Sequence, residues 1–349
     1  MRKIAFYLPQ FHPTPENNEW WGQGFTEWTN VTKSRPLFIG HSQPRYPTSL
    51  GYYDLRVSET RAAQSDLAVT HGISAFCYWH YWFAGRRILE RPFNEVLESG
   101  NPSVGFCLGW ANQSWTGSWY GAHKRVLLEQ TYPGETDNEA HFNAVLPAFL
   151  DSRYIKVNGC PLFYIFQPSS MPNIRQFVMQ WQFLAKKHGF KGIYFVGERS
   201  QLLAGFIPSS GFHEEYGFNA TVVTRLPATE SIQSKIHNIF RRKLLGGPNV
   251  FRYQAKYKAL SDDRPLVNVY PAIYPNWDHS PRSGRRGIVL TGHTPTKFSN
   301  HYEYAMSIGL ANKDEEQFVF IKSWNEWAEG NYLEPDRLWG NQFLEVLKS

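Results

Sequence analysis

The sequence has few cysteines and no apolar run long enough to cross a bilayer. Its three cysteines, Cys77, Cys107 and Cys160, are far apart, and each lies inside or at the start of an apolar run. An odd number without Cys-x-x-Cys spacing excludes a disulfide framework and favours buried free thiols in a reducing compartment. No stretch of about 18 apolar residues is present. Met1–Ile4 opens directly into a strand-like run, so we expect a cytoplasmic protein without a signal peptide.

Motifs of several common enzyme classes are also absent. The chain has no Asp-x-Asp element, which metal-dependent nucleotide-sugar transferases usually carry, and no Gly-x-Ser-x-Gly nucleophile elbow. Gly22-Gln23-Gly24 precedes no helix with the pattern of a phosphate-binding loop. There is no recognised nucleic-acid-binding module or interleaved base-stacking pattern. We therefore expect no cofactor and no nucleic-acid partner.

The net charge of +6 has a local origin in residues 231–260, which hold seven basic residues and no acidic one. Without these seven, 29 basic residues face 30 acidic ones, so the rest of the chain is near neutral. The segment could contact an anionic membrane surface, a lipid-linked glycan or an anionic saccharide. A solvated, partly helical insertion is the plainer alternative. The oligomeric state cannot be read from the sequence.

Apolar runs alternate with helix-like segments along the whole chain. Most of the runs are continuously apolar, as expected for parallel strands that are covered on both faces. Eight such runs in 349 residues, with no linker-like division, predict a single (β/α)₈ TIM barrel over 1–349 with long βα loops. The predicted strands are Ile4–Phe11, Ile73–Tyr81, Val104–Trp110, Pro161–Gln167, Gly192–Gly197, Phe212–Phe218, Val267–Tyr274 and Phe318–Trp324.

Clusters of polar and aromatic residues follow most of the predicted strands. The carboxyl ends of barrel strands meet on one face, which is where active sites of such barrels lie. Aromatic residues make up 16% of the chain, and in polar clusters they indicate a ligand with flat faces, such as a sugar. As substrate-binding residues we expect Tyr7, His12, Glu27, Trp28, Trp79, His80, Trp110, Asn112, Gln113, Tyr216, Trp277 and Asn325.

The segment from Asn325 to Gly330 places two carboxylates, Glu326 and Glu329, between tryptophans and directly after an apolar strand. In a helical turn this spacing puts the Cβ atoms about 5–6 Å apart. Such a pair could divide the acid and base roles of glycosidic-bond chemistry, because like charges held close push their pKa values apart. The alternative is a helix start whose acids favour the positive end of the helix dipole.

Histidines at predicted strand ends raise the alternative of a metal site. His12, His80, His213 and His279 occupy such positions, and histidine with carboxylates at barrel strand ends can bind a metal. The first strand has no His-x-His, however, and the neighbours are Trp and Tyr rather than acids. We expect no metal and favour hydrogen bonding to sugar hydroxyls.

Six long, specific motifs run along the chain from the first strand to about Asp336. They are Leu8-Pro9-Gln10-Phe11-His12-Pro13, Trp20–Val31, Gly51-Tyr52-Tyr53-Asp54-Leu55, Cys77–Phe83, Trp110-Ala111-Asn112 and Trp324–Gly330. These motifs resemble those of the WbsX-type proteins, a family labelled glycosyltransferase in many bacterial polysaccharide loci, and are similar to glycoside hydrolase family 99.

The resemblance to family 99, the endo-α-mannosidase and endomannanase barrels, implies a retaining mechanism without a metal. Glu326 would deprotonate the substrate's 2-hydroxyl, which attacks its own anomeric carbon to form a 1,2-anhydro sugar. Glu329 would protonate the leaving group and then activate the incoming water or sugar. The mechanism requires a 2-hydroxyl trans to the leaving group, as in α-mannosides. The chain departs from the WbsX pattern at Gln113, where a glutamate usually follows Trp-Ala-Asn.

Three functions therefore stay open at this point. The first is a family-99-like enzyme acting on an α-linked bacterial polysaccharide, such as a mannoside or an O-antigen-type repeat. The second is a glycosyltransferase or transglycosylase on the same barrel in surface-polysaccharide biosynthesis. The third is a non-catalytic glycan-binding barrel, against which the retention of both glutamates argues.

Overall fold

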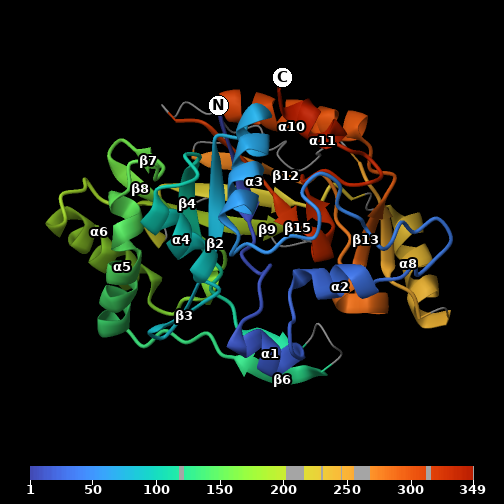
Figure 1. The fold of residues 1–349 in the computed structure, drawn as a ribbon, viewed down its shortest axis with the longest axis horizontal. Helices are drawn as coiled ribbons and strands as arrows, with labels where there is room; N and C mark the ends of the chain where they lie inside the picture. Colours follow the sequence, from blue (N-terminus) through green and yellow to red (C-terminus); the bar gives the residue numbers. More distant parts are fainter. Residues whose placement is uncertain are drawn as a thin grey trace.

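A computed structural model describes residues 1–117, 122–201, 216–228, 231–244, 246–254, 268–311 and 316–348 of the chain. Eight parallel strands close into a barrel, because β1 pairs with β2 on one side and with β14 on the other (Figure 1). Around the barrel these strands are β1 Arg2–Tyr7, β2 Ala75–Phe83, β4 Gly105–Trp110, β8 Cys160–Ile165, β9 Tyr194–Gln201, β10 Ala220–Arg225, β12 Val269–Ile273 and β14 Phe318–Ile321.

The predicted TIM barrel is confirmed, and seven of its strands overlap the predicted runs. The sixth prediction, Phe212–Phe218, is misplaced: residues 212–215 lie outside the described residues, and β10 begins only at Ala220. Gly217 explains the offset, since its φ of +75° is a left-handed turn conformation that a strand cannot contain. Tyr216 therefore precedes the strand instead of lying in it.

Helices connect successive strands on the outside of the barrel (Figure 1). Trp181 of α6 is fully buried, and its ring meets Phe142 of α5 edge to face at 5.4 Å between centroids. The connecting helices are α3 Ser58–Thr70, α4 Arg91–Ser99, α5 Glu135–Leu150, α6 Ile174–Lys187, α8 Ile232–Leu244 and α10 Pro295–Ala311, and α11 Gln342–Glu345 lies near the C-terminus.

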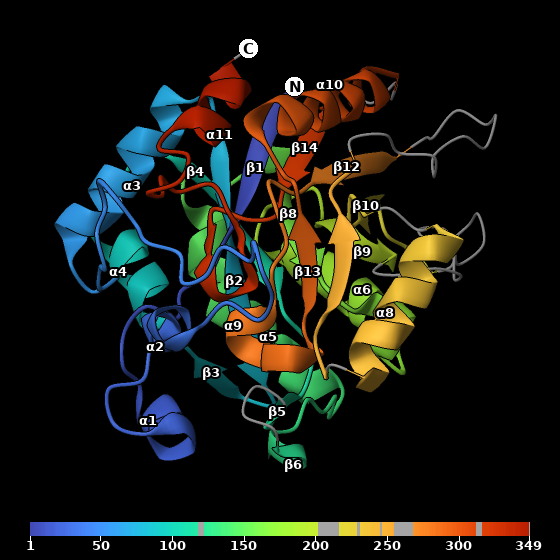
Figure 2. The same cartoon turned by 90° about the vertical axis from the view of Figure 1, so that its right-hand side faces the viewer.

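The segments that follow the strand ends carry small elements of their own. Figure 2 shows two of these, β11 Asn249–Arg252 and β13 Ile288–Thr291, side by side as a parallel pair with α8 next to β11. The described part of the predicted basic insertion, 231–244 and 246–254, thus forms α8 and β11. The remaining small elements are α1 Pro15–Trp21, α2 Glu27–Lys33, β3 Arg86–Ile88, β5 Trp115–Gly117, β6 Ala122–Leu128, β7 Lys156–Val157, α9 Ser280–Ser283, β15 Asn325–Glu326 and β16 Asn331–Tyr332.

All three cysteines are free thiols, as predicted. Cys77 and Cys107 are buried and lie opposite each other in the register of β2 and β4, whereas Cys160 is half-buried. No helix in the described ranges is both long enough and apolar enough to cross a membrane.

The packing between α5 and α6 predicts a large effect of truncating its central ring. We expect Trp181→Ala to lower the free energy of unfolding by about 3–5 kcal/mol, because it leaves a cavity among aromatic side chains. On the same helix Phe183 is 67% exposed, so Phe183→Ala should change stability by no more than about 0.5 kcal/mol. Urea denaturation followed by circular dichroism measures both, and equal effects would contradict this account of the core.

Candidate active site

The acidic segment, residues 325–330, follows β14 and forms no α-helix. It begins as β15 and continues as a single 3₁₀ turn over Trp327–Glu329. The alternative account of its acids as a helix start is therefore wrong. Gly330 ends the turn at a φ of +69°, and a Cβ there would lie 2.8 Å from the backbone nitrogen of Asp278. Only glycine fits this position, and the turn directs both glutamates into a cavity.

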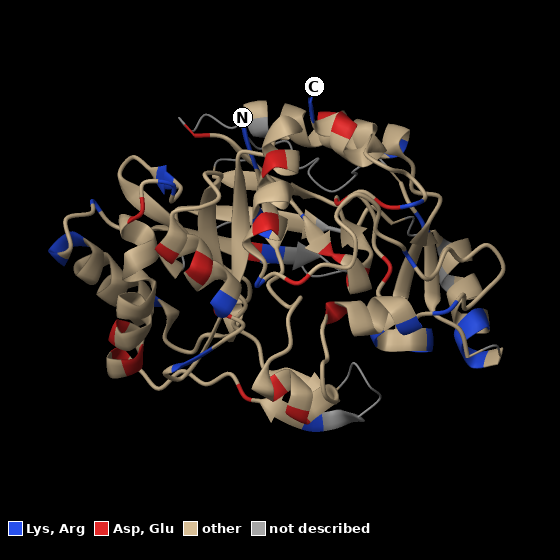
Figure 3. Cartoon of the chain, viewed as in Figure 1, with Lys and Arg blue, Asp and Glu red and all other residues tan. Residues whose placement is uncertain are grey.

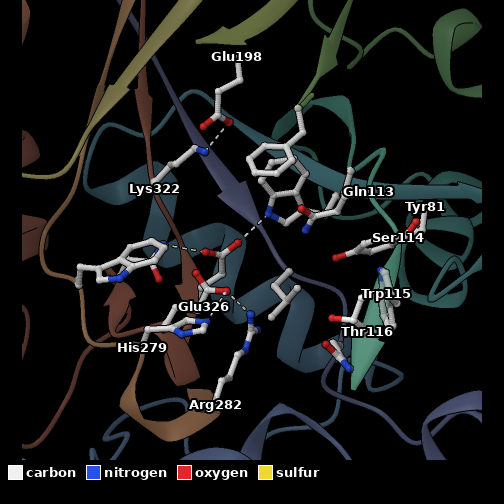
Figure 4. Close-up of a pocket in the computed structure, with 18 of the residues that line it drawn as sticks. Tyr81, Gln113, Ser114, Trp115, Thr116, Glu198, His279, Arg282, Lys322 and Glu326 are labelled. Atoms are coloured by element: carbon white, nitrogen blue, oxygen red, sulfur yellow. Dashed lines mark hydrogen bonds and ion pairs between the residues drawn. The ribbon is translucent and has the colours of Figure 1, made fainter. Parts of the chain in front are cut away.

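The cavity has a volume of about 350 Å³ and lies where the barrel strands end, within the usual range for small-ligand pockets. Its apolar surface is largely aromatic, and Figure 4 shows labelled side chains that point into it from several elements. The aromatic residues that line it are Trp21, Trp79, Tyr81, Trp115, Phe166, Tyr274 and Trp277.

Glu326 is held by two hydrogen-bond donors on the cavity wall. The indole Nε1 of Trp79 donates to one carboxylate oxygen at 2.7 Å, and Nδ2 of Asn331 donates to the other, also at 2.7 Å. Burial, followed by the nearby charge of Glu329, raises the pKa of Glu326 despite these donors. The carboxyl group is thus fixed in place while its proton affinity is increased, which suits a group that exchanges protons with a ligand.

Glu329 belongs to a buried charge cluster with Arg282 and Glu27. Arg282 donates to Glu329 through Nη1 and to Glu27 Oε1 through Nη2 at 2.8 Å. Glu27 also accepts the backbone N–H of Ala328 at 3.0 Å. Burial opposes the charge of Arg282, but the attraction of the glutamates outweighs burial and leaves its pKa raised. Arg282 therefore stays cationic and stabilises the charged form of Glu329.

His279 lies beside this cluster and lines the same cavity. Burial, then the charge of Arg282, lowers its pKa to about 4, so its imidazole is neutral near pH 7. Its Nε2 lies 3.9 Å from Oε1 of Glu329. Because a neutral imidazole both donates and accepts, His279 can hydrogen-bond a hydroxyl group of a ligand.

A second buried ion pair lies across the cavity from Arg282 (Figure 4). Nζ of Lys322 donates to Glu198 at 2.6 Å, and the Glu198 carboxylate also accepts from Tyr164 and Thr224. The ammonium group lies 5.1 Å from the ring centre of Phe166 and 5.7 Å from that of Trp79. Such a pair offers a ligand a cationic donor whose charge is already compensated.

Of the fourteen predicted site residues, five line the cavity: Trp79, Gln113, Trp277, Glu326 and Glu329. Two more support it from behind. Glu27 binds Arg282 as described, and Asn325 exchanges hydrogen bonds with the backbone of Leu8, accepting from its N–H at 2.7 Å and donating to its carbonyl at 3.0 Å. Asn325 thereby ties the acidic segment to the end of β1.

Strand alternation removes two predicted residues from the cavity. Side chains along a strand point alternately to its two faces, so Trp79 and Tyr81 of β2 point inward while His80 points toward α5. There His80 Nε2 lies 2.8 Å from Nε2 of His141. Trp110 also faces α5 and meets His141 edge to face at 4.7 Å. Both residues belong to the layer between strands and helices.

The other five predicted residues are structural or lie away from the cavity. Tyr7 donates to Gln64 at 2.6 Å and His12 contacts the carbonyl of Pro9 at 3.1 Å, both in buried positions. Trp28 is buried and donates to the carbonyl of Tyr53 at 2.8 Å. The two remaining residues are Asn112, which clamps the backbone of Gln167, and Tyr216, which precedes the amino end of β10.

The charged residues Arg282, Lys322 and Glu198 are the main ones that sequence reasoning missed. Glu198 and Arg282 follow predicted strands and Lys322 lies inside one, but none of the three belongs to the polar-aromatic clusters from which site residues were predicted. Lys322 had one usable signal, since it is a lone charge inside the apolar run that leads to the acidic segment. Arg282 had none, because only the folding of three loops brings it to its partners.

Within the described ranges, no three histidine, cysteine or acidic side chains gather in a way that could hold a metal ion. His12, His80 and His279 have the separate environments given above, and His213 lies outside the described residues.

Comparison with known proteins places the chain in a family. The pattern of the family described as "Glycosyltransferase WbsX" matches residues 3–347, and the chain belongs to that family. "Uncharacterized protein WxcX" of Xanthomonas campestris pv. campestris is 34% identical over 352 residues, which cover 99% of this chain and 49% of that protein. The chain thus spans about half the length of this relative.

Two solved structures share the fold. A protein titled "Glycoside hydrolase-like protein" aligns with a TM-score of 0.61 at 14% identity, over 99% of this chain and 92% of its own. The GH99 endo-alpha-mannosidase from Bacteroides thetaiotaomicron aligns with a TM-score of 0.56 at 12% identity, over 99% and 95%. At these identities the likeness concerns the fold of the chain.

Because Arg282 lies in a buried charge cluster, we expect its removal to lower the free energy of unfolding by an amount that depends on pH. Arg282→Met leaves Glu27 and Glu329 without a cation. Burial already raises the pKa of Glu27, and loss of the attraction of Arg282 raises it further in the folded state. A folded state that binds more protons than the unfolded one loses stability as pH rises. We expect a loss of about 3–5 kcal/mol at pH 8, and a smaller loss at pH 5, from urea denaturation.

Arg86→Met is the matched control for this measurement. Arg86 pairs with Glu16 at 2.6 Å, but its side chain is 53% exposed, so its loss should cost no more than about 1 kcal/mol. An Arg282→Met cost that is the same at both pH values would contradict the assignment of the cluster as charged.

Proposed function

We propose that the protein is a glycoside-active enzyme of the retaining endo-glycosidase type, acting on an α-linked bacterial polysaccharide such as a mannoside or an O-antigen-type repeat. One observation carries the proposal: Glu326 and Glu329 line a single aromatic cavity in distinct electrostatic environments. Two carboxyl groups that differ in this way are what glycosidic-bond cleavage needs. A binding protein has no use for the pair, which argues against a non-catalytic barrel.

In the proposed mechanism Glu326 is the base. Its carboxylate takes the proton of the substrate's 2-hydroxyl, whose oxygen attacks the anomeric carbon of the same sugar and forms a 1,2-anhydro ring. Glu329 gives a proton to the leaving oxygen as the glycosidic bond breaks. In the second step it removes a proton from the incoming water, which attacks the anomeric carbon and opens the anhydro ring, while Glu326 returns its proton to the 2-oxygen, so that both carboxyl groups are restored. The donors Trp79 and Asn331 keep Glu326 oriented through both steps.

The mechanism places one requirement on the charge cluster. Arg282 favours the charged form of Glu329, whereas Glu329 must hold a proton when the leaving group departs. The Glu329 charge raises the pKa of Glu326, and in this mechanism the two carboxyls act together: as Glu326 takes the proton of the 2-hydroxyl, Glu329 gives a proton to the leaving oxygen.

Transfer is the second candidate, and the family description favours it. The same acid–base pair could transfer the anhydro sugar to a hydroxyl group of another glycan in place of water. A glycosyltransferase would instead need a nucleotide-sugar donor. Incubating the protein with a short α-mannan and no nucleotide separates these cases, since cleavage or elongation supports the barrel chemistry and turnover only with a nucleotide-sugar supports the transferase.

Substitution of either glutamate should separate catalysis from binding. Glu326→Gln and Glu329→Gln are each expected to lower turnover of a short α-mannan by about 10²-fold or more, while binding changes little. Tryptophan fluorescence reports that binding, since Trp79 and Trp277 line the cavity. Glu139→Gln on the exposed face of α5 serves as the control. Unchanged turnover in both cavity variants would disprove the proposal.

The two roles can be tested with altered substrates. An oligosaccharyl fluoride releases fluoride without a proton, so Glu329→Gln should regain turnover on it, whereas Glu326→Gln should not. A 2-deoxy substrate lacks the internal nucleophile and should be inert with the unmodified protein. Rescue of Glu326→Gln alone would reverse the assignment, and cleavage of the 2-deoxy sugar would exclude the anhydro route.

A further inference from the structure

The outer face of α8 exposes four large apolar side chains. Ile236, Ile239, Phe240 and Leu244 are each more than half exposed, from 56% for Phe240 to 67% for Leu244. Their spacing of three and four residues puts them on one stripe of the helix. The opposite face is anchored, because the buried Asn238 side chain donates to the carbonyl of Val250 at 3.0 Å and accepts its N–H at 2.7 Å.

A neighbouring loop extends this apolar surface. The guanidinium of Arg241 lies 4.8 Å from the ring centre of Phe38, so the loop after α2 packs against the last turns of α8. The next residue, Ile39, has a fully exposed side chain. We call these residues, Phe38 and Ile39 with the outer face of α8, the α8 surface.

The segment that forms α8 and β11 carries charge of one sign. Arg241, Arg242 and Lys243 lie in the last turn of the helix, and no acidic residue occurs between positions 231 and 260. Figure 3 shows basic residues gathered at this end of α8. An apolar stripe beside a basic cluster is the pattern of helices that lie in a membrane interface.

A second helix shows that apolar exposure alone does not define such a surface. On α6, Met179 and Phe183 are 71% and 67% exposed. The groove that they line contains Glu135 and Glu139 from α5 and Lys187 of α6, so the charge beside its apolar residues is mixed. An anionic surface would be attracted less there than at α8, which makes α6 a natural control.

We propose that the α8 surface binds the surface of anionic phospholipid bilayers. Phe240, Leu244 and Ile39 enter the boundary between headgroups and acyl chains, and Arg242 and Lys243 contact the anionic headgroups. Neither the apolar stripe nor the basic cluster is sufficient alone. A short apolar stripe binds a bilayer weakly, and basic residues alone bind it in a strongly salt-dependent way.

The position of the α8 surface links it to the cavity. In Figures 1 and 3 the basic end of α8 points to the side of the barrel where α2 and α9 lie. β11 follows α8, and Phe251 of β11 belongs to an apolar cluster that packs against the cavity residue Trp277. If the proposed function holds, this arrangement brings the cavity close to lipid-linked glycans; bilayer binding itself does not depend on that function.

Vesicle sedimentation tests the proposal on the protein as it stands. The probes are phosphatidylcholine vesicles and vesicles of phosphatidylcholine with phosphatidylglycerol at a ratio of about 7:3. We expect binding about tenfold or more stronger to the anionic vesicles, decreasing with added salt. Phe240→Ser with Leu244→Ser, and separately Arg242→Glu with Lys243→Glu, should each lower this binding about tenfold.

Met179→Ser with Phe183→Ser on α6 is the matched control and should leave vesicle binding unchanged. Equal binding to both vesicle types, or loss of binding in the α6 variant, would overturn the proposal. So would a dimer in sedimentation velocity that Phe240→Ser with Leu244→Ser dissociates, because a second copy would then cover the α8 surface. Circular dichroism checks that each variant is folded. Turnover of a soluble glycan should be the same in the α8 variants, which separates this proposal from the catalytic one.

Discussion

Arg282 joins three separate loops through one buried charge. Glu27 comes from the loop after β1, Arg282 from the loop after β12, and Glu329 from the loop after β14. Unpaired, each of these charges would be costly in a region from which water is largely excluded. The loops therefore meet at the guanidinium, which holds Glu329 in place and adds to the effect of burial in keeping His279 neutral.

The two ion pairs give the cavity a defined polarity. Arg282 lies on the side of the carboxyl pair, and Lys322 with Glu198 lies across the cavity from it. Between them the walls are aromatic, so a bound sugar would face flat apolar surfaces and meet polar groups at its edges. This division explains why the cavity contains charged groups that the aromatic motifs of the sequence did not predict. The basic cluster of α8 lies outside the cavity and does not alter this balance.

The sequence predicted the barrel well, because continuous apolar runs report strands that are covered on both faces. It misplaced one strand at Phe212–Phe218, where Gly217 breaks the run in a way that only its φ reveals. The site was predicted in part. The spacing of Glu326 and Glu329 predicted that both belong to the site. The aromatic clusters predicted more cavity residues than the structure has, since His80 and Trp110 lie on the outer faces of their strands. Arg282 could not be found, because its partners are distant in sequence.

The contact between His80 and His141 sets a limit on how acid inactivation can be interpreted. One Nε2 atom must accept the hydrogen bond of the other, so at most one of the two rings can carry a charge, and burial lowers the pKa of each well below its usual value. Below about pH 6.5 these two histidines bind protons in the unfolded chain but not in the folded one, so the folded state loses stability as the pH falls. Activity lost on acidification would then reflect loosening between β2 and α5 as well as titration in the cavity. The acid limb of a pH–rate profile therefore reports ionisation of the catalytic groups only at pH values where the protein is shown to be folded.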